Sequence, residues 1–377
     1  MSKTRNYGID LLKAVSMLMI ICLHILGNGG VLNNTVPMSL KGEVIWLLEI
    51  CCFCAVNCYG LISGYVGFGT KHKLSNLIYL WIQVLFISLL SSAITLVVGI
   101  SKGASINYLG LIKSSLPVLS GEFWYFSAYF CLFLFMPLLD ILVEKAPREL
   151  LKKSFVLALV VFCILDPMKE SIVFSLRRGY SVIWLAILYL IGAYTAKYDV
   201  LKRLSVKKSF LLYAISCLLT FATRIVIGLV TGLLLGVPQK QDILIEYIFI
   251  FVLSSAVFLL SAFSKINIKK SFLIKTIMLL STTSFGVYII HTTPFVWKMM
   301  NGKFAWMADI NIILTCLLLP AFAVCIYLMC AIIDIIRKAI FKLIRIKELC
   351  LWLDGIIEKL LQRINNAIPT LPKDGEH

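Results

Sequence analysis

Long apolar runs, separated by short polar segments, follow one another along most of this 377-residue chain. A run of about 20 apolar residues is the length that crosses the ~30 Å hydrocarbon core of a bilayer as a helix. Runs of this kind lie at 9–27, 44–67, 75–100, 122–143, 153–167, 180–197, 209–235, 243–264, 272–296 and 310–336. The pattern predicts an all-α, polytopic membrane bundle of about ten transmembrane helices. The fifth run is short before Asp166 and Pro167, so we expect it to be tilted, re-entrant or only partly spanning.

Composition and charge agree with a membrane protein. The chain is 60% hydrophobic and only 15% charged, which excludes a soluble domain. The net charge of +17 would suit a nucleic-acid-binding protein, but the basic residues concentrate in alternate loops, around Lys71, Lys145, Lys202 and Lys269. Under the positive-inside rule, this alternation predicts a multi-pass protein of the cell membrane with both termini cytoplasmic and no nucleic-acid partner.

The chain divides into two predicted parts, a transmembrane domain at 1–336 and a cytoplasmic tail at 337–377. The tail begins with five basic residues among apolar ones, and this predicts an amphipathic basic helix. Such a helix is held on the inner membrane surface by apolar burial and by anionic lipid, although a partner-binding tail is an alternative.

The twelve cysteines do not predict a disulfide framework or a metal site. Nearly all of them lie within predicted spans. Cys51, Cys54 and Cys58 share one helix face, but apart from Glu49 no histidine or carboxylate stands at ligand spacing among them. They are expected to be small packing residues, and no metal is predicted.

The first apolar run contains three ionisable side chains, those of Asp10, Lys13 and His24. Charged groups inside a membrane helix cost about 2.5–3.5 kcal/mol on insertion scales, so they usually face a protein-lined cavity. Lys13 and His24 are about three helical turns or ~16 Å apart, and only ~20° apart around the axis. One helix face is therefore expected to carry a cation near its start and an imidazole near its end. A simple ion pair of Asp10 with Lys13, whose ammonium snorkels to the interface, is the alternative.

The predicted topology places further polar side chains on the outer side, with His24. His291 lies near the outer end of the ninth run and shares a stripe with Ser284 and Tyr288. The other members of this group are Glu49, Glu122, Trp124, Tyr125, Arg177 and Arg178. Together they predict an outward-facing pocket, although a histidine or tyrosine near a helix end can also be an interfacial anchor. Arg224, in the middle of the seventh run, should pair with an acid or line a polar path.

Four stretches of the chain resemble acyltransferase family 3 of integral membrane proteins. They are Gly8–Lys13 with ten residues between Lys13 and His24, Leu61–Tyr65, Phe123–Phe126 with Met136–Leu139, and Ser284–His291. The resemblance implies a ten-helix bundle that transfers an acyl group, usually acetyl from acetyl-CoA, to a hydroxyl of an extracytoplasmic carbohydrate or lipid-linked glycan. Family members often have an arginine-rich stretch after the Ser-Gly-Tyr segment. This chain has Lys71 and Lys73 there instead, which are less directional contacts for the phosphates of the coenzyme.

The resulting hypothesis is O-acyl transfer, with roles assigned residue by residue. His24 is the expected general base, because an imidazole titrates near neutral pH and can be oriented by a second group, here Glu49 or Glu122. Tyr125, Tyr288 or His291 would donate to the developing oxyanion. The donor side is assigned to Asp10, Lys13, Ser63, Lys71 and Lys73, and the acceptor side to Trp124, Tyr125, Arg177, Arg178 and Arg224.

Two other classes of function compete with this hypothesis. A transporter or flippase would also use polar groups at both membrane faces and a central arginine such as Arg224. A non-catalytic sensor or scaffold would leave the shared face of Lys13 and His24 unexplained. The residues do not decide whether the acyl group passes directly or through an acyl-enzyme.

Overall fold

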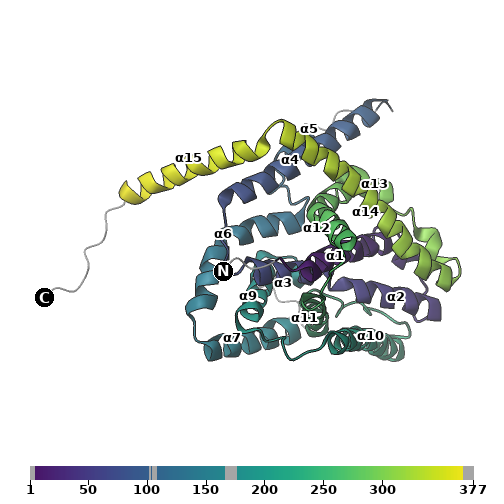
Figure 1. The fold of residues 1–377 in the computed structure, drawn as a ribbon. Coiled ribbons are helices and arrows are strands. Elements are labelled where there is room, and N and C mark those ends of the chain that lie inside the picture. The colour runs from purple at the N-terminus through teal and green to yellow at the C-terminus, as the bar shows by residue number, and fades with distance from the viewer. Residues whose placement is uncertain (1–4, 102, 104–107, 166–175, 368–377) are drawn as a thin grey trace.

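The computed structural model describes residues 5–101, 103, 108–165 and 176–367, and every regular element in these ranges is a helix (Figure 1). Helices are expected because the bilayer core offers no water to backbone N–H and C=O groups, which must therefore bond within their own segment. Within the described ranges, seven stretches are long and apolar enough to cross a membrane. They are α1 (Tyr7–Leu26), α2 with α3 (Leu40–Phe53 and Ala55–Gly67), α4 (Leu74–Ser101), α6 (Trp124–Lys145), α10 (Val206–Leu235), α12 (Ser271–His291) and α14 (Ile312–Leu343). The prediction of an all-α membrane bundle is confirmed.

The remaining predicted spans correspond to shorter helices. The sixth run forms α9 (Val182–Tyr198) and the eighth forms α11 (Ile250–Ser264), of 17 and 15 residues. The fifth run forms α7 (Arg148–Val160), followed by a wider π-type turn at Val161–Leu165. Asp166 and Pro167, on which the expectation for this run depended, lie outside the described residues. Short helices α5 (Tyr108–Ser115) and α13 (Pro294–Met300) lie in the connections.

Helix α1 lies at the centre of the bundle. It packs against α2, α3, α11, α12 and α14 (Figure 1). Its side chains Leu12, Ile21, Ile25 and Leu26 are completely buried. Because protein surrounds α1 on several sides, its polar side chains can face other helices. This is the expected arrangement, since exposing charged side chains to lipid is costly.

Helices α3 and α9 cross with their backbones in direct contact. A Cβ atom added at Gly64 would overlap the carbonyl oxygen of Tyr189, and one added at Gly192 would overlap that of Leu61. Small residues at a crossing allow this close approach. The resulting van der Waals packing stabilises helix association in lipid, where the hydrophobic effect does not drive it.

At the C-terminal end, the last long apolar helix passes the predicted domain boundary at residue 336. Helix α14 continues without a break to Leu343, and a turn at Arg345, where φ is positive, leads into α15 (Ile346–Ala367). The amphipathic helix is present and extends away from the bundle (Figure 1), with exposed apolar side chains such as Trp352 and Leu361. It is tied to the bundle where the amide of Ser75, at the start of α4, donates to the Asp354 carboxylate at 3.0 Å. Its contact with the membrane stays a prediction.

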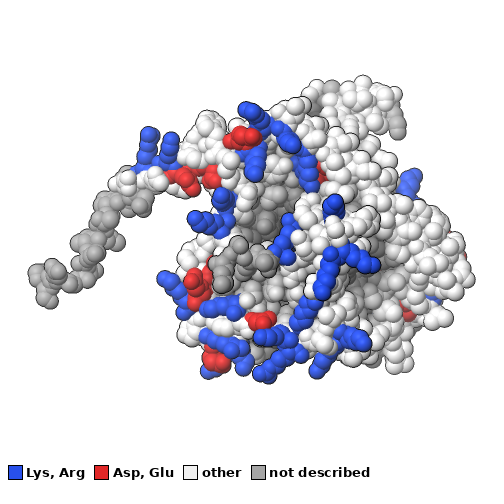
Figure 2. All heavy atoms as spheres, in the orientation of Figure 1, with Lys and Arg blue, Asp and Glu red and all other residues white. Residues whose placement is uncertain are grey.

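Charged side chains are unevenly distributed over the surface. In Figure 2, lysine and arginine side chains gather around a hollow in the face seen there, over the region of α7 and α9 and the start of α15. The right-hand part of the same view is almost uncharged. An uncharged belt is what a membrane-embedded surface requires, and a basic rim is typical of a cytoplasmic face.

Candidate active site

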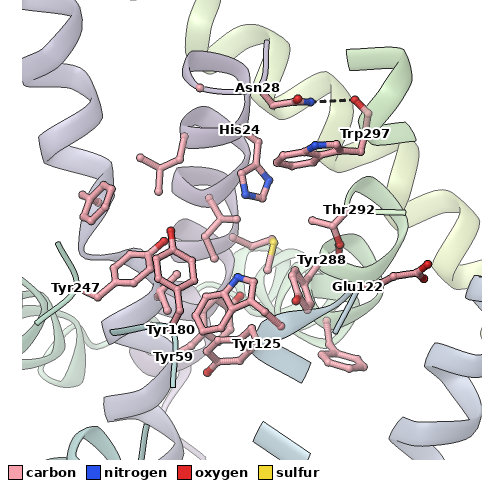
Figure 3. A pocket seen from close by; sticks show the side chains of 18 of the residues that line it. His24, Asn28, Tyr59, Glu122, Tyr125, Tyr180, Tyr247, Tyr288, Thr292 and Trp297 are labelled. Carbon is pink, nitrogen blue, oxygen red and sulfur yellow. Dashed lines mark hydrogen bonds between the residues drawn. The ribbon is translucent and has the colours of Figure 1, made fainter. Parts of the chain in front are cut away.

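A cavity of about 610 Å³ lies beside the C-terminal half of α1. Residues of α1, α2, α3, α6, α12 and α13 line it, together with residues from the segments that connect the helices (Figure 3). Its polar and amphipathic lining residues are His24, Asn28, Glu49, Tyr59, Glu122, Trp124, Tyr125, Tyr180, Tyr247, Tyr288, Thr292 and Trp297. A mostly apolar cavity with a few convergent polar groups is the usual form of a small-molecule site.

His24 and His291 meet at this cavity although 267 positions separate them in the chain. Nδ1 of His24 lies 2.9 Å from Nε2 of His291. His24 lines the cavity and is half-buried, whereas His291 lies behind it and is completely buried. The rings of Trp297 and His24 pack edge to face, with 4.8 Å between their centroids, and lie beside each other in Figure 3. The imidazole of His24 is therefore held from two sides.

The hydrogen bonds of His291 determine the tautomer of His24. Nδ1 of His291 lies 2.6 Å from the carbonyl oxygen of Val287, and a carbonyl only accepts, so Nδ1 carries the hydrogen. With both rings neutral, Nε2 of His291 then accepts from the Nδ1–H of His24. The free lone pair of His24 is on Nε2, the nitrogen that a general base at this cavity needs.

This arrangement changes two predicted roles. His24 is oriented by His291, since its Nδ1 is bonded there and not to Glu49 or Glu122. Both nitrogens of His291 are engaged, one with Val287 and one with His24, so His291 has no N–H left to donate to an oxyanion. The sequence placed the two histidines at one level, but the rotation of each helix about its axis decides which side chains touch.

Glu49 and Glu122 line the cavity without a described partner. Oε2 of each is buried and, within the described part of the chain, accepts no hydrogen bond. Glu49, on α2, is only 7% exposed. Glu122 lies in the loop before α6, where burial raises the pKa of its carboxyl and the charge of Lys113 offsets part of that rise.

The predicted aromatic residues are brought together as expected. Trp124 and Tyr125 of α6 and Tyr288 of α12 all line the cavity. The ring of Tyr125 contacts those of Tyr59 and Tyr288 edge-on, at 6.3 and 6.1 Å between centroids. The hydroxyl of Tyr59 donates to the backbone oxygen of Lys13 at 2.6 Å, which links the cavity to the first half of α1.

Asp10 and Lys13 lie in the first half of α1, in a polar cluster. Asp10 accepts from Arg5 Nε at 2.6 Å and from the Ser281 hydroxyl at 3.0 Å, and Lys13 Nζ lies 3.8 Å from it. The hydrogen bond to Asp10 raises the pKa of Arg5. The side chain of Lys13 is 30% exposed. Its ammonium group is therefore still accessible to a ligand although it forms this ion pair.

Three predicted arginines do not line the cavity. Arg224 is buried and bonded to both Glu43 oxygens, at 2.9 and 3.2 Å, and to Gln241. The structural pairing that the sequence left open is thus present. Arg178 pairs with Glu246 at 2.7 Å, and Arg177 is exposed.

The remaining donor-side residues lie away from the cavity. Lys71 and Lys73 are exposed in the loop before α4, and the Ser63 hydroxyl donates within α3 to the Tyr59 carbonyl. The hydrogen bonds that tie this loop to α6 were not predicted from the sequence. His72 Nε2 lies 3.0 Å from Asp140, which also accepts from the Gly69 amide.

Tyr189 donates to the other carboxylate oxygen of Asp140 at 2.6 Å. The available signal was an acidic residue inside the fourth apolar run, which seldom occurs without a partner. Asp334 in the tenth run carried the same signal, and it pairs with Arg337 at 2.8 Å. Among the described residues, no cluster of three or more His, Cys, Asp or Glu side chains could hold a metal.

Comparison with known proteins gives one match. No curated protein and no solved structure matched the chain. A family model described as an acyltransferase domain matches residues 6–331, which include α1 with His24, all lining residues of the cavity and His291. The chain therefore belongs to acyltransferase family 3.

Proposed function

We propose that this membrane acyltransferase transfers an acetyl group from cytoplasmic acetyl-CoA to a hydroxyl of an extracytoplasmic or lipid-linked glycan. The observation that carries the proposal is the tautomer of His24. Its Nδ1 is bonded to His291, and its Nε2 is left free beside a cavity of about 610 Å³.

The chemistry follows from this free nitrogen. Nε2 of His24 takes the proton of the acceptor hydroxyl as its oxygen attacks the thioester carbonyl. A C–O bond forms, the carbonyl electrons move to oxygen, and the hydroxyls of Tyr125 and Tyr288 are the groups assigned to stabilise that charge. When the C–S bond breaks, the His24 imidazolium returns the proton to the leaving thiolate, and coenzyme A departs as a thiol.

The donor is assigned to the first half of α1. Lys13 is ~16 Å from His24 along the helix, and its partly exposed ammonium would attract a phosphate or polarise an amide of the donor arm. Lys71 and Lys73, exposed in the loop before α4, would contact the nucleotide phosphates as point charges. The acceptor is assigned to the aromatic part of the cavity, where Trp124 and Tyr125 present apolar ring faces.

The decisive experiment is thioester cleavage by purified protein in nanodiscs, measured as free thiol released from acetyl-CoA. His24→Ala should lower turnover by about 10²-fold or more, the usual contribution of a general base. Thr292→Val is the matched control, because Thr292 lines the same cavity and has no assigned role. Equal turnover of wild-type and His24→Ala protein would contradict the proposal, and a transporter would cleave no thioester in either form.

The proposal also includes an orientation, with both termini cytoplasmic. Lys303→Cys and Lys202→Cys replace exposed residues in loops assigned to opposite sides. In a background without the twelve native cysteines, an impermeant maleimide added to intact cells should label position 303 and leave position 202 unlabelled. Labelling at 202 from outside would reverse the assignment.

A further inference from the structure

The carboxylate of Glu49 is buried at the cavity without a counter-charge. Its side chain is only 7% exposed, and Oε2 accepts no hydrogen bond from the described residues. A buried carboxylate without a partner is strongly disfavoured. The general base does not use it, because His24 takes its orientation from His291.

In the described part of the chain, no lysine or arginine lines the cavity, whereas Glu49 and Glu122 both do. Of the arginines on neighbouring elements, Arg224 is paired with Glu43 and Arg178 with Glu246. Arg177 is exposed and does not line the cavity. The lining therefore carries two carboxyl groups and no permanent positive charge.

An aromatic wall lies on the same side of α2 as Glu49. Phe53 follows Glu49 by one helical turn and shares its face. The ring of Phe53 stacks on Tyr247 at 4.8 Å, Tyr247 contacts Tyr180 at 5.0 Å, and Tyr180 contacts Trp124 at 4.5 Å between centroids. All these rings line the cavity, and Figure 3 shows the two tyrosines together below His24.

Aromatic faces beside a carboxylate form an environment that favours a cation attached to an apolar ring. We infer that the acceptor carries a protonated amine, as an amino sugar does, which Glu49 binds while the aromatic wall covers the sugar ring. This inference rests on the proposed function, since it concerns the acceptor of that reaction. The same two carboxylates would repel an acceptor with an acidic group near the reacting hydroxyl.

The test is equilibrium binding to the full-length protein in nanodiscs, measured by calorimetry. Three probes share one ring and differ in charge: methyl glucosaminide, methyl glucoside and methyl glucuronide. At a pH where the amine is protonated, wild-type protein should bind the glucosaminide at least ~10-fold more tightly than the glucoside, the scale of a charge-assisted hydrogen bond. The glucuronide should bind most weakly.

Glu49→Gln removes the charge and keeps the shape, so the preference for the amine should fall to about one. Glu49→Asp keeps the charge and should retain part of the preference, and Thr292→Val should retain all of it. Melting temperatures of the variants show that each is folded.

Equal wild-type affinity for the glucosaminide and the glucoside would overturn the inference. It would also be overturned by an undiminished amine preference in Glu49→Gln, or by no detectable glucosaminide binding. The proposed function is judged separately, by thioester cleavage. If the protein acetylates methyl glucoside as fast as methyl glucosaminide, the proposed acetyl transfer is supported. The inference that the acceptor carries a protonated amine is then refuted.

Discussion

Replacing His291 tests whether this residue acts in catalysis itself or only positions the imidazole of His24. His291→Leu removes the nitrogen that accepts from His24 Nδ1 at 2.9 Å and leaves an apolar side chain in a completely buried position. His24 then loses the bond that fixes its ring and its tautomer. Because Nε2 of His24 is still present, general-base catalysis should be weakened and not abolished.

The magnitude follows from one hydrogen bond between neutral groups. Such a bond contributes about 0.5–1.5 kcal/mol, and each 1.36 kcal/mol of barrier changes a rate tenfold. We therefore expect kcat of His291→Leu to fall by roughly 2- to 13-fold. His291→Gln offers an amide oxygen to His24 Nδ1–H and should recover part of this loss, whereas His24→Ala should lose about 10²-fold or more.

The assay is a double-mutant cycle on thiol release from acetyl-CoA. If His291 acts through His24, the double variant His24→Ala, His291→Leu should be no slower than His24→Ala alone. Additive losses would show that His291 acts independently of His24. Wild-type turnover in His291→Leu would refute the tautomer argument itself.

Three further predictions concern charge and packing. Lys13→Ala should raise KM for acetyl-CoA, with Lys13→Arg keeping part of the affinity because charge matters more than geometry at a phosphate; equal KM in all three forms would leave Lys13 a structural role. Arg224→Met should lower stability by about 3–5 kcal/mol, since Glu43 stays buried without a partner, and adding Glu43→Leu should restore much of it; a change in KM without loss of melting temperature would contradict this. Gly64→Ala should lower the melting temperature, because its Cβ overlaps the Tyr189 carbonyl and overpacking costs about 1–3 kcal/mol; an unchanged temperature would show that the crossing can open.

The sequence was sufficient to predict the helices and to bring His24 and His291 to the same level of the bundle. Runs of about 20 apolar residues permit only helices in a bilayer, and loop charge then assigns each helix end to a side. This reasoning placed His24 and His291 at the same level, although the contact spans 267 positions. Helix ends were less certain, as the continuation of α14 to Leu343 shows.

The partners of the polar groups were harder to predict. The depth of a side chain in the membrane follows from its position along the helix. Which side chains touch depends on the rotation and tilt of each helix, and these are determined by the packing of the whole bundle. The sequence therefore offered Glu49 and Glu122 as partners of His24, and the structure has His291. Arg224 was expected either to pair with an acid or to line a polar path. The structure pairs it with Glu43, 181 positions away, which nothing in the local pattern identified.

The central position of α1 has a consequence for synthesis of the protein. Helix α1 leaves the ribosome well before α12 and α14, which pack against it. At 5–20 residues per second, the 267 positions between His24 and its partner take on the order of 10–50 s to make. Throughout that interval Asp10, Lys13 and His24 are in or near the membrane without their late partners. A nascent chain stalled before α12 should therefore present α1 as a polar, incompletely packed helix.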